Sequence, residues 1–301
     1  MWRPARRAGL TLLLGLSLCG SGHAASLRYC DRPAPLSAAQ QDLIFRFAAL
    51  IKNELEGSDR RVAIVARSGL DLARFGQRYS HAGVSLQTGL ETAWAVRQLY
   101  YACDEGKPRL FDQGLLGFLL GMNDPANSFV SVLLLPAAQA RALENTALDK
   151  RRALEALGPT YSANAYAFGL DYQNCNQWLI ELMAAAWAPL EGAPENLRAQ
   201  AQDWLRARGY EPSSIAVGPL MALSAFIPWV HNSDHPREDL ARAVYRISMP
   251  ASIEAFVRTT LPGASRIEFC RSGTRVVIHR GWDAISPGCV PGENDSAITL
   301  E

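Results

Sequence analysis

Apolar residues recur with helical spacing in three parts of the chain. Ser37 precedes the first of these segments, and Gln40 follows it by three residues, which is the spacing of a capping box. The apolar positions of this segment are Leu43, Ile44, Phe47, Leu50, Ile51 and Leu55. The pattern predicts an amphipathic helix over 37–56, and comparable patterns predict a charged helix over 137–157 and an amphipathic helix over 195–208.

Short runs rich in β-branched and aromatic residues predict strands. Three of them are RVAIVAR (61–67), YSHAGVSLQ (79–87) and TAWAVRQLYYA (92–102). Because a Thr-Gly turn separates the second run from the third, we expect these two runs to form a hairpin. The run SFVSVLLLP (128–136) predicts a further buried strand.

The last third of the chain adds two further patterns. IEFCRSGTRVVIHRGW (267–282) predicts a hairpin around a Ser-Gly turn. The long apolar run 215–230 is interrupted by a glycine and two prolines, which predicts a buried or substrate-facing segment rather than a membrane span. A helix, several strands, further helices and a small β tail follow one another, and this order is typical of the α+β class.

The first 24 residues have the three parts of a secretory signal peptide. Three arginines precede an apolar stretch at 9–18 that is too short to span a membrane, and small residues stand at positions 22 and 24. We therefore expect 1–24 to be removed on export, across the inner membrane to the periplasm. A lipid anchor on Cys19 is the alternative, although the bulky Leu18 disfavours it.

Composition limits the classes of partner that the chain can have. The mature chain, 25–301, is long enough to bury the core of a single domain. The whole sequence carries a formal charge of +1, which becomes about −2 without the three arginines of the signal. A near-neutral chain gives no electrostatic basis for binding nucleic acid, and no motif predicts a cofactor.

The number of cysteines left after removal of the signal is odd. They are Cys30, Cys103, Cys175, Cys270 and Cys289. In an oxidising compartment four can pair. A Cys270–Cys289 bridge is plausible because these two bracket the predicted hairpin, which leaves Cys30 with Cys103 and Cys175 as the remaining thiol. Spacing alone does not decide this connectivity.

Cys175 stands at the start of an unusually apolar helix in YQNCNQWLIELMAAAW (172–187). Asn174 is a good N-cap residue, and Gln177 is placed to reach back to it. At the first helical position the unpaired N–H groups and the helix dipole lower the pKa of a thiol. A helix apolar on all sides is buried, so Cys175 is either a prepared nucleophile or a small core residue.

Four histidines are available as partners for such a thiol. His81 opens the predicted strand 79–87, whereas His279 lies in the predicted C-terminal hairpin and is expected at the surface. His231, Asp234 and His235 are clustered in HNSDHP. A His-x3-His pair binds metal when it lies on a helix, but the surrounding Asn, Ser and Pro favour a loop, so a metal site is the weakest hypothesis.

Several short segments carry a family resemblance. ARSGLDLARFG, RYSHAG, VRQLYYACDE, RLFDQGL, YSANAYAF and YQNCNQW resemble an uncharacterised bacterial family of secreted proteins, domain of unknown function 2145. A histidine strand that precedes an Asn-Cys helix also resembles circularly permuted papain-like enzymes of the NlpC/P60 and lecithin:retinol acyltransferase-like groups. The second resemblance implies a permuted papain-like fold with helical insertions, a core at about 37–210 and an extension at 211–301. The Asp-Cys-Ser signature of NlpC/P60 endopeptidases is absent.

The resemblance also implies roles for individual residues. Cys175 corresponds to the nucleophile and His81 to the general base. Gln98, polar within an apolar strand, corresponds to the third residue that orients the imidazole. Tyr166 and Asn174 correspond to groups that support the oxyanion site. The alternatives are Arg97 or Glu91 in place of Gln98, and Tyr172 in place of Tyr166.

Together these features predict a secreted thiol hydrolase or acyltransferase that acts on an amide or ester carbonyl. Cell-wall peptides are the first expected substrate and acyl lipids or thioesters the second. A non-catalytic envelope-binding or scaffold protein with the same fold is the alternative from another class. A metal-dependent hydrolase at the HNSDHP cluster is the third.

Overall fold

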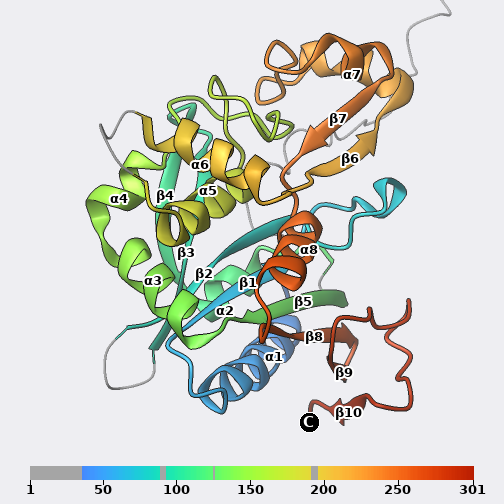
Figure 1. Ribbon diagram of the computed structural model, residues 1–301. Helices are drawn as coiled ribbons and strands as arrows, with labels where there is room; N and C mark the ends of the chain where they lie inside the picture. Colours follow the sequence, from blue (N-terminus) through green and yellow to red (C-terminus); the bar gives the residue numbers. More distant parts are fainter. Residues whose placement is uncertain (1–35, 89–92, 125, 191–195) are drawn as a thin grey trace, which may run out of the picture. The chain divides into compact units, whose positions relative to one another are not determined.

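The computed structural model describes residues 36–88, 93–124, 126–190 and 196–301. The buried runs rich in β-branched residues pair into one antiparallel sheet (Figure 1). Its strands are β1 Val62–Arg67, β2 His81–Thr88, β3 Ala93–Ala102, β4 Lys107–Gly114, β5 Asn127–Leu134, β8 Ser265–Ser272, β9 Arg275–Arg280 and β10 Ser296–Thr299. Their spatial order is β10-β9-β8-β5-β1-β2-β3-β4. The C-terminal strands therefore lie beside β5, on the side of β1 away from β2.

Helices cover both faces of this sheet. Their bounds are α1 Ala38–Glu56, α2 Leu115–Leu120, α3 Ala137–Leu148, α4 Lys150–Glu155, α5 Cys175–Trp187, α6 Leu197–Ala207, α7 Arg237–Ala241 and α8 Pro250–Thr260. On one face α1 and α2 share an apolar core with alternate residues of β1, β3, β5, β8 and β9. On the other face α8 lies over Ala66 and Ala82, and Arg97 donates a hydrogen bond to Ala147 of α3. Because α5 contacts α3, α8 and the strands β2 and β3, it lies on this second face.

Several elements lie where local sequence patterns predict them. Ser37 and Gln40 form the predicted capping box at the start of α1. Strand β1 matches the predicted run 61–67, and β2 and β3 pair as the expected hairpin. Strands β8 and β9 form the predicted C-terminal hairpin. The α+β prediction is therefore confirmed by a mixed fold with a large antiparallel sheet.

Two predicted elements are wrong in detail. The helix predicted over 137–157 is divided into α3 and α4, because the Asp149 side chain accepts the N–H groups of Arg151 and Arg152 and caps a new helix. The apolar run 215–230 is not one buried segment, so the first predicted alternative is wrong, while the second, a substrate-facing segment, stays a prediction. It comprises the end of β6, Ser213–Ala216, and a 3-10 helix, η4, over Gly218–Phe226, and Phe226 is 82% exposed.

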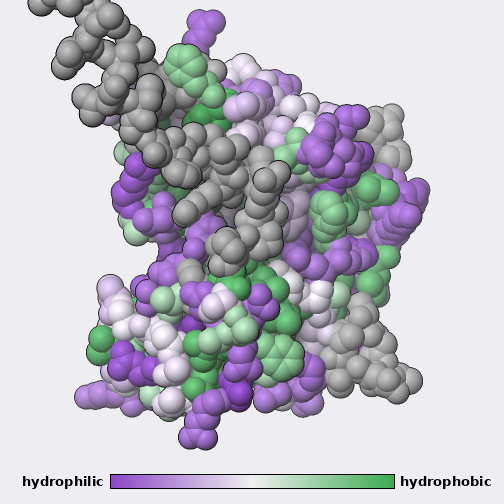
Figure 2. Space-filling model, turned by 180° about the vertical axis from the view of Figure 1, so that it is seen from behind, coloured by the Kyte–Doolittle hydropathy of each residue, from purple (hydrophilic) through white to green (hydrophobic). Residues whose placement is uncertain are grey.

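The described part of the chain has no helix long and apolar enough to cross a bilayer. Hydrophobic and hydrophilic residues are interspersed on the side of the molecule that Figure 2 shows. Beside η4, β6 pairs with β7, Val244–Ile247, in a separate two-stranded sheet with its own small apolar cluster. Strands β4, β6, β7 and β10 and helices α2, α7 and α8 were not predicted from sequence.

One of the two predicted disulfides is confirmed among the described residues. Cys270 and Cys289 form the predicted disulfide, with their Cα atoms 5.3 Å apart. Cys103 is also disulfide-bonded, and its predicted partner Cys30 lies outside the described residues, as does the predicted signal peptide 1–24. Among the described cysteines, Cys175 is outside the disulfides and is buried.

Candidate functional site

The start of α5 is capped as the sequence predicts. Asn174 has an extended backbone, and its side-chain oxygen accepts the N–H of Gln177 at 2.7 Å. The expected return contact from Gln177 is wrong. Its amide nitrogen donates instead to the carbonyls of Tyr166 and Gly169 and to Glu181, because the preceding loop folds back over the helix start.

A buried polar network around Glu181 holds this helix start in place. The Glu181 carboxylate is fully buried and accepts hydrogen bonds from four side chains. The donors are Gln173 at 2.6 Å, Gln177 at 3.2 Å, Arg198 at 2.7 Å and Gln202 at 2.7 Å. The network joins α5 to α6 and to the loop before Cys175, so it fixes the position of the thiol-bearing turn.

His81 is the first residue of β2 and lies directly opposite Arg67 of β1. Its Nε2 is 2.6 Å from Oε1 of Gln98, which is fully buried on β3. The amide nitrogen of Gln98 donates to Gln113 of β4, so the amide oxygen faces the imidazole. Nε2 of His81 therefore carries the proton, and Nδ1 is the nitrogen that can accept one.

The surroundings of His81 keep the imidazole neutral. The pKa of His81 is lowered from 6.5 to about 3. Burial is the largest cause and the nearby Arg67 guanidinium the second, and the hydrogen bond to Gln98 raises the pKa by a smaller amount. Arg67 is itself only 3% exposed and donates to the Gly121 carbonyl and the Tyr100 hydroxyl. Among the residues that the structure describes, no carboxylate forms an ion pair with Arg67. The site thus contains a buried positive charge beside a neutral base.

The His81 ring and the body of α5 lie on opposite faces of the sheet. The register places His81, Arg67 and Gln98 on the face covered by α1 and α2, where the His81 ring is 5.9 Å from that of Phe118. The two parts of the candidate site can meet only at the end of β2. There the Asn176 amide donates to the carbonyl of Ser80 at 3.2 Å, so the residue after Cys175 contacts the residue before His81.

The other predicted support residues have different surroundings. The Tyr166 ring packs against Phe168 and His235, and the Arg246 guanidinium lies 5.4 Å from its centre, so its oxyanion role remains a prediction. Tyr172 stacks on His231 with ring centres 4.4 Å apart.

Of the two alternatives to Gln98, the structure describes Arg97 alone. Arg97 points to the face opposite that of His81 and pairs with Asp112 of β4. Glu91 lies outside the described residues. Of the three candidates for the third residue, the structure places Gln98 against His81.

The histidine cluster near residue 235 is engaged in structural contacts. His235 Nε2 donates to the Asn164 carbonyl at 2.7 Å, and Asp234 accepts the N–H of Tyr166 at 2.8 Å. The described residues contain no group of three or more His, Cys, Asp or Glu side chains able to hold a metal ion. His279, expected at the surface, is 17% exposed and bonds Asp295.

Sequence reasoning missed the residues that surround the imidazole and join it to α5. These are Arg67, Tyr100, Gln113 and Asn176. One signal was present in the sequence, because Arg67 ends the apolar run 62–66 of a predicted buried strand. A charged side chain is seldom buried unless it has a partner. Gln113 and Asn176 carried no such signal, since their roles depend on strand pairing and on where α5 begins.

A comparison with protein families gives one match. The family model described as an uncharacterised protein conserved in bacteria, DUF2145, matches residues 54–257. The matched region includes His81, Gln98 and Cys175 and ends before β8. No curated protein and no solved structure matches the chain.

Proposed function

The chain belongs to the bacterial family DUF2145, and we propose that it is a thiol hydrolase or acyltransferase with a permuted papain-like active site. One observation carries the proposal. The capped first turn of α5, with the thiol of Cys175, is bonded through Asn176 to Ser80, and the next residue is a histidine oriented by Gln98. A thiol at a helix start, a nearby neutral imidazole and a third residue that orients it are the parts of a nucleophilic catalyst.

The proposed reaction begins with attack of the Cys175 sulfur on an amide or ester carbonyl. Nδ1 of His81 takes the thiol proton as the carbon–sulfur bond forms, and the imidazolium then gives that proton to the leaving amine or alcohol. The backbone N–H of Cys175, at the start of α5, is the proposed donor to the oxyanion. Water or a second acceptor then cleaves the thioester and regenerates the thiol.

The surroundings of His81 favour a neutral imidazole in the resting site. Burial and the Arg67 charge keep His81 unprotonated at neutral pH, and the same lowering of its pKa makes the imidazole a weaker base than a free histidine. Gln98 orients the ring without adding negative charge, so the imidazolium is stabilised only while the thiolate is beside it. The proton transfer is therefore expected to accompany the attack rather than precede it.

Cell-wall peptides are the first substrate class that we propose, because the predicted export would bring the chain to them. Acyl lipids are the second class, since η4 presents the exposed ring of Phe226 and is otherwise built from small and apolar residues. Both classes supply the amide or ester carbonyl that the mechanism requires.

Replacing His81 with alanine is expected to slow alkylation of Cys175 by iodoacetamide about tenfold at pH 7, because the sulfur loses its proton acceptor. The rate is measured by peptide mass spectrometry on the purified mature chain. Turnover of cell-wall peptides or p-nitrophenyl acyl esters should fall by roughly 10²- to 10⁴-fold in the same variant and disappear in Cys175→Ala.

His279→Ala is the matched control, because His279 bonds Asp295 in the C-terminal hairpin and should leave the alkylation rate unchanged. Equal rates in wild type and His81→Ala would reject the dyad. That result would favour the second candidate, a non-catalytic envelope-binding protein. The burial of both Cys175, 7% exposed, and His81, 8% exposed, is the observation that favours this candidate.

We also propose that the protein is exported and cleaved after Ala24, on the basis of the arginine-flanked apolar stretch that precedes it. Sequencing of the exported protein should find an N-terminus at or within a few residues of Ala25. A mature chain that still begins at Met1 would contradict the periplasmic placement and, with it, the preference for cell-wall substrates.

A further inference from the structure

The C-terminal hairpin lies outside the region shared with the family, yet it contacts the segment that leads into His81. Glu268 of β8 is fully buried, and one of its carboxylate oxygens accepts the hydroxyl of Tyr79 and pairs with Arg78 at 2.7 Å. Arg266 adds a hydrogen bond to the Tyr79 hydroxyl at 2.9 Å. Two strands, β5 and β1, separate β8 from β2, so this contact reaches across the sheet.

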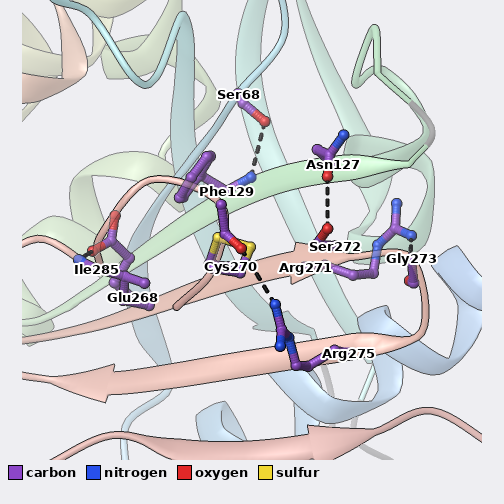
Figure 3. The surroundings of a disulfide bond; sticks show 12 residues. Ser68, Asn127, Phe129, Glu268, Cys270, Arg271, Ser272, Gly273, Arg275 and Ile285 are labelled. Carbon is purple, nitrogen blue, oxygen red and sulfur yellow. Dashed lines mark hydrogen bonds between the residues drawn. A yellow bond between two sulfur atoms is a disulfide. The ribbon is translucent and has the colours of Figure 1, made fainter. Parts of the chain in front are cut away.

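The other oxygen of Glu268 is held by the disulfide-closed loop. It accepts the N–H of Ile285 at 2.7 Å, as Figure 3 shows beside the Cys270–Cys289 bond. Ile285 and both cysteines are buried together in a small apolar cluster. Removal of the disulfide would release the loop that carries Ile285 and leave one side of the buried carboxylate without its donor.

The segment next to Tyr79 makes the bonds that join the two halves of the candidate site. Ser80 donates its N–H to the Arg67 carbonyl at 3.1 Å and accepts the Asn176 amide at 3.2 Å. Displacement of Tyr79 would therefore move the residue that sets the position of His81 and contacts the start of α5.

We propose that Glu268 is a positioning residue of the candidate site, fixed by the Cys270–Cys289 disulfide and acting on His81 through Tyr79. We call Glu268, Ile285 and the two cysteines the C-terminal clamp. The inference rests on the proposed function for its effect on Cys175, but the link from the clamp to Ser80 is independent of catalysis. A disulfide at one end of the chain thereby controls the geometry of a site formed mainly by residues 67–176.

The test is a double-mutant cycle between the clamp and Tyr79. Cys270→Ala/Cys289→Ala should speed hydrogen exchange at the Ser80 amide and slow alkylation of Cys175 by about threefold. Tyr79→Phe should do the same. Cys175 should be alkylated no more slowly in the combined variant than in Tyr79→Phe alone, because Tyr79→Phe already removes the hydrogen bond between Tyr79 and Glu268. Glu268→Gln tests the same contact from its other side, because it removes the charge that pairs with Arg78 and accepts the Tyr79 hydroxyl.

Tyr245→Phe is the matched control, because Tyr245 is comparably buried and its hydroxyl donates to Asn232, a contact that involves neither the clamp nor the Ser80–Asn176 bond. It should change neither Ser80 exchange nor the Cys175 rate. Ser80 exchange that does not respond to removal of the disulfide, or additive effects in the combined variant, would overturn the clamp. Faster Ser80 exchange with an unchanged Cys175 rate would support the clamp and contradict the proposed function instead.

Discussion

Replacing Arg198 with methionine is expected to lower the free energy of unfolding by about 3–5 kcal/mol, because the Glu181 carboxylate is left buried without its cationic partner. Arg198 is 7% exposed and also donates to the carbonyls of Leu170 and Tyr172. The substitution therefore removes hydrogen bonds from the loop before Cys175 as well as a charge. Denaturant unfolding at pH 7, with the midpoint and slope compared to wild type, measures the loss.

The control lies on the same helix. Arg206→Met removes a side chain that is 46% exposed and paired with Asp203, itself 75% exposed, so a loss of no more than about 1 kcal/mol is expected. Equal losses in the two variants would show that Glu181 is not held by Arg198. In the double variant Arg198→Met/Glu181→Leu, much of the stability should return, because no charge remains buried.

The folded protein should lose stability steeply in acid, and His81 should account for a large part of the loss. The pKa of His81 is about 3 in the folded protein and 6.5 in the unfolded chain. Below pH 6.5 the unfolded chain therefore binds a proton that the folded protein does not. Above pH 6.5 the titration of His81 takes nothing from the free energy of unfolding. As the pH drops from 6.5 toward 3, this titration lowers the free energy of unfolding by up to about 1.4 kcal/mol per pH unit.

The variant His81→Gln isolates this contribution, because other groups titrate in both proteins. Between pH 7 and pH 4.5 wild type should lose about 2–3 kcal/mol more than the variant in denaturant unfolding. Parallel pH profiles for the two proteins would contradict a neutral, buried His81.

The charge of Arg67 can be tested in the same assay. Arg67→Met should raise the pKa of His81 toward 6.5 and make the pH profile shallower, since a nearby positive charge is removed. Arg271→Met is the matched control, because Arg271 is also fully buried but lies on β8 over the Phe47 ring. The pKa of His81, measured by NMR, should be the same in Arg271→Met as in wild type.

Local features of the chain were readable without the fold. The capping box at Ser37 and the N-cap at Asn174 depend on side chains that bond backbone groups three residues away, so spacing alone predicts them. The β8–β9 hairpin and the Cys270–Cys289 bridge join neighbours in sequence, and the odd number of cysteines then pointed to Cys175 as the thiol left over. These are short-range relations that the order of residues determines.

What surrounds the candidate site was decided by tertiary structure. Strand register sets His81 opposite Arg67 and brings Gln98 of the next strand to its ring, and a shift of one residue would turn these side chains to the other face. The Gln177 side chain bonds carbonyls of a loop rather than the backbone of its cap residue, and Glu268 contacts Tyr79, which lies 189 residues away in the sequence. Such contacts join groups that the chain brings together only when the sheet is complete, so no local pattern encodes them. The sequence by itself determined which residues carry the candidate chemistry, and the tertiary structure alone decided which of them meet and which buried charges surround them.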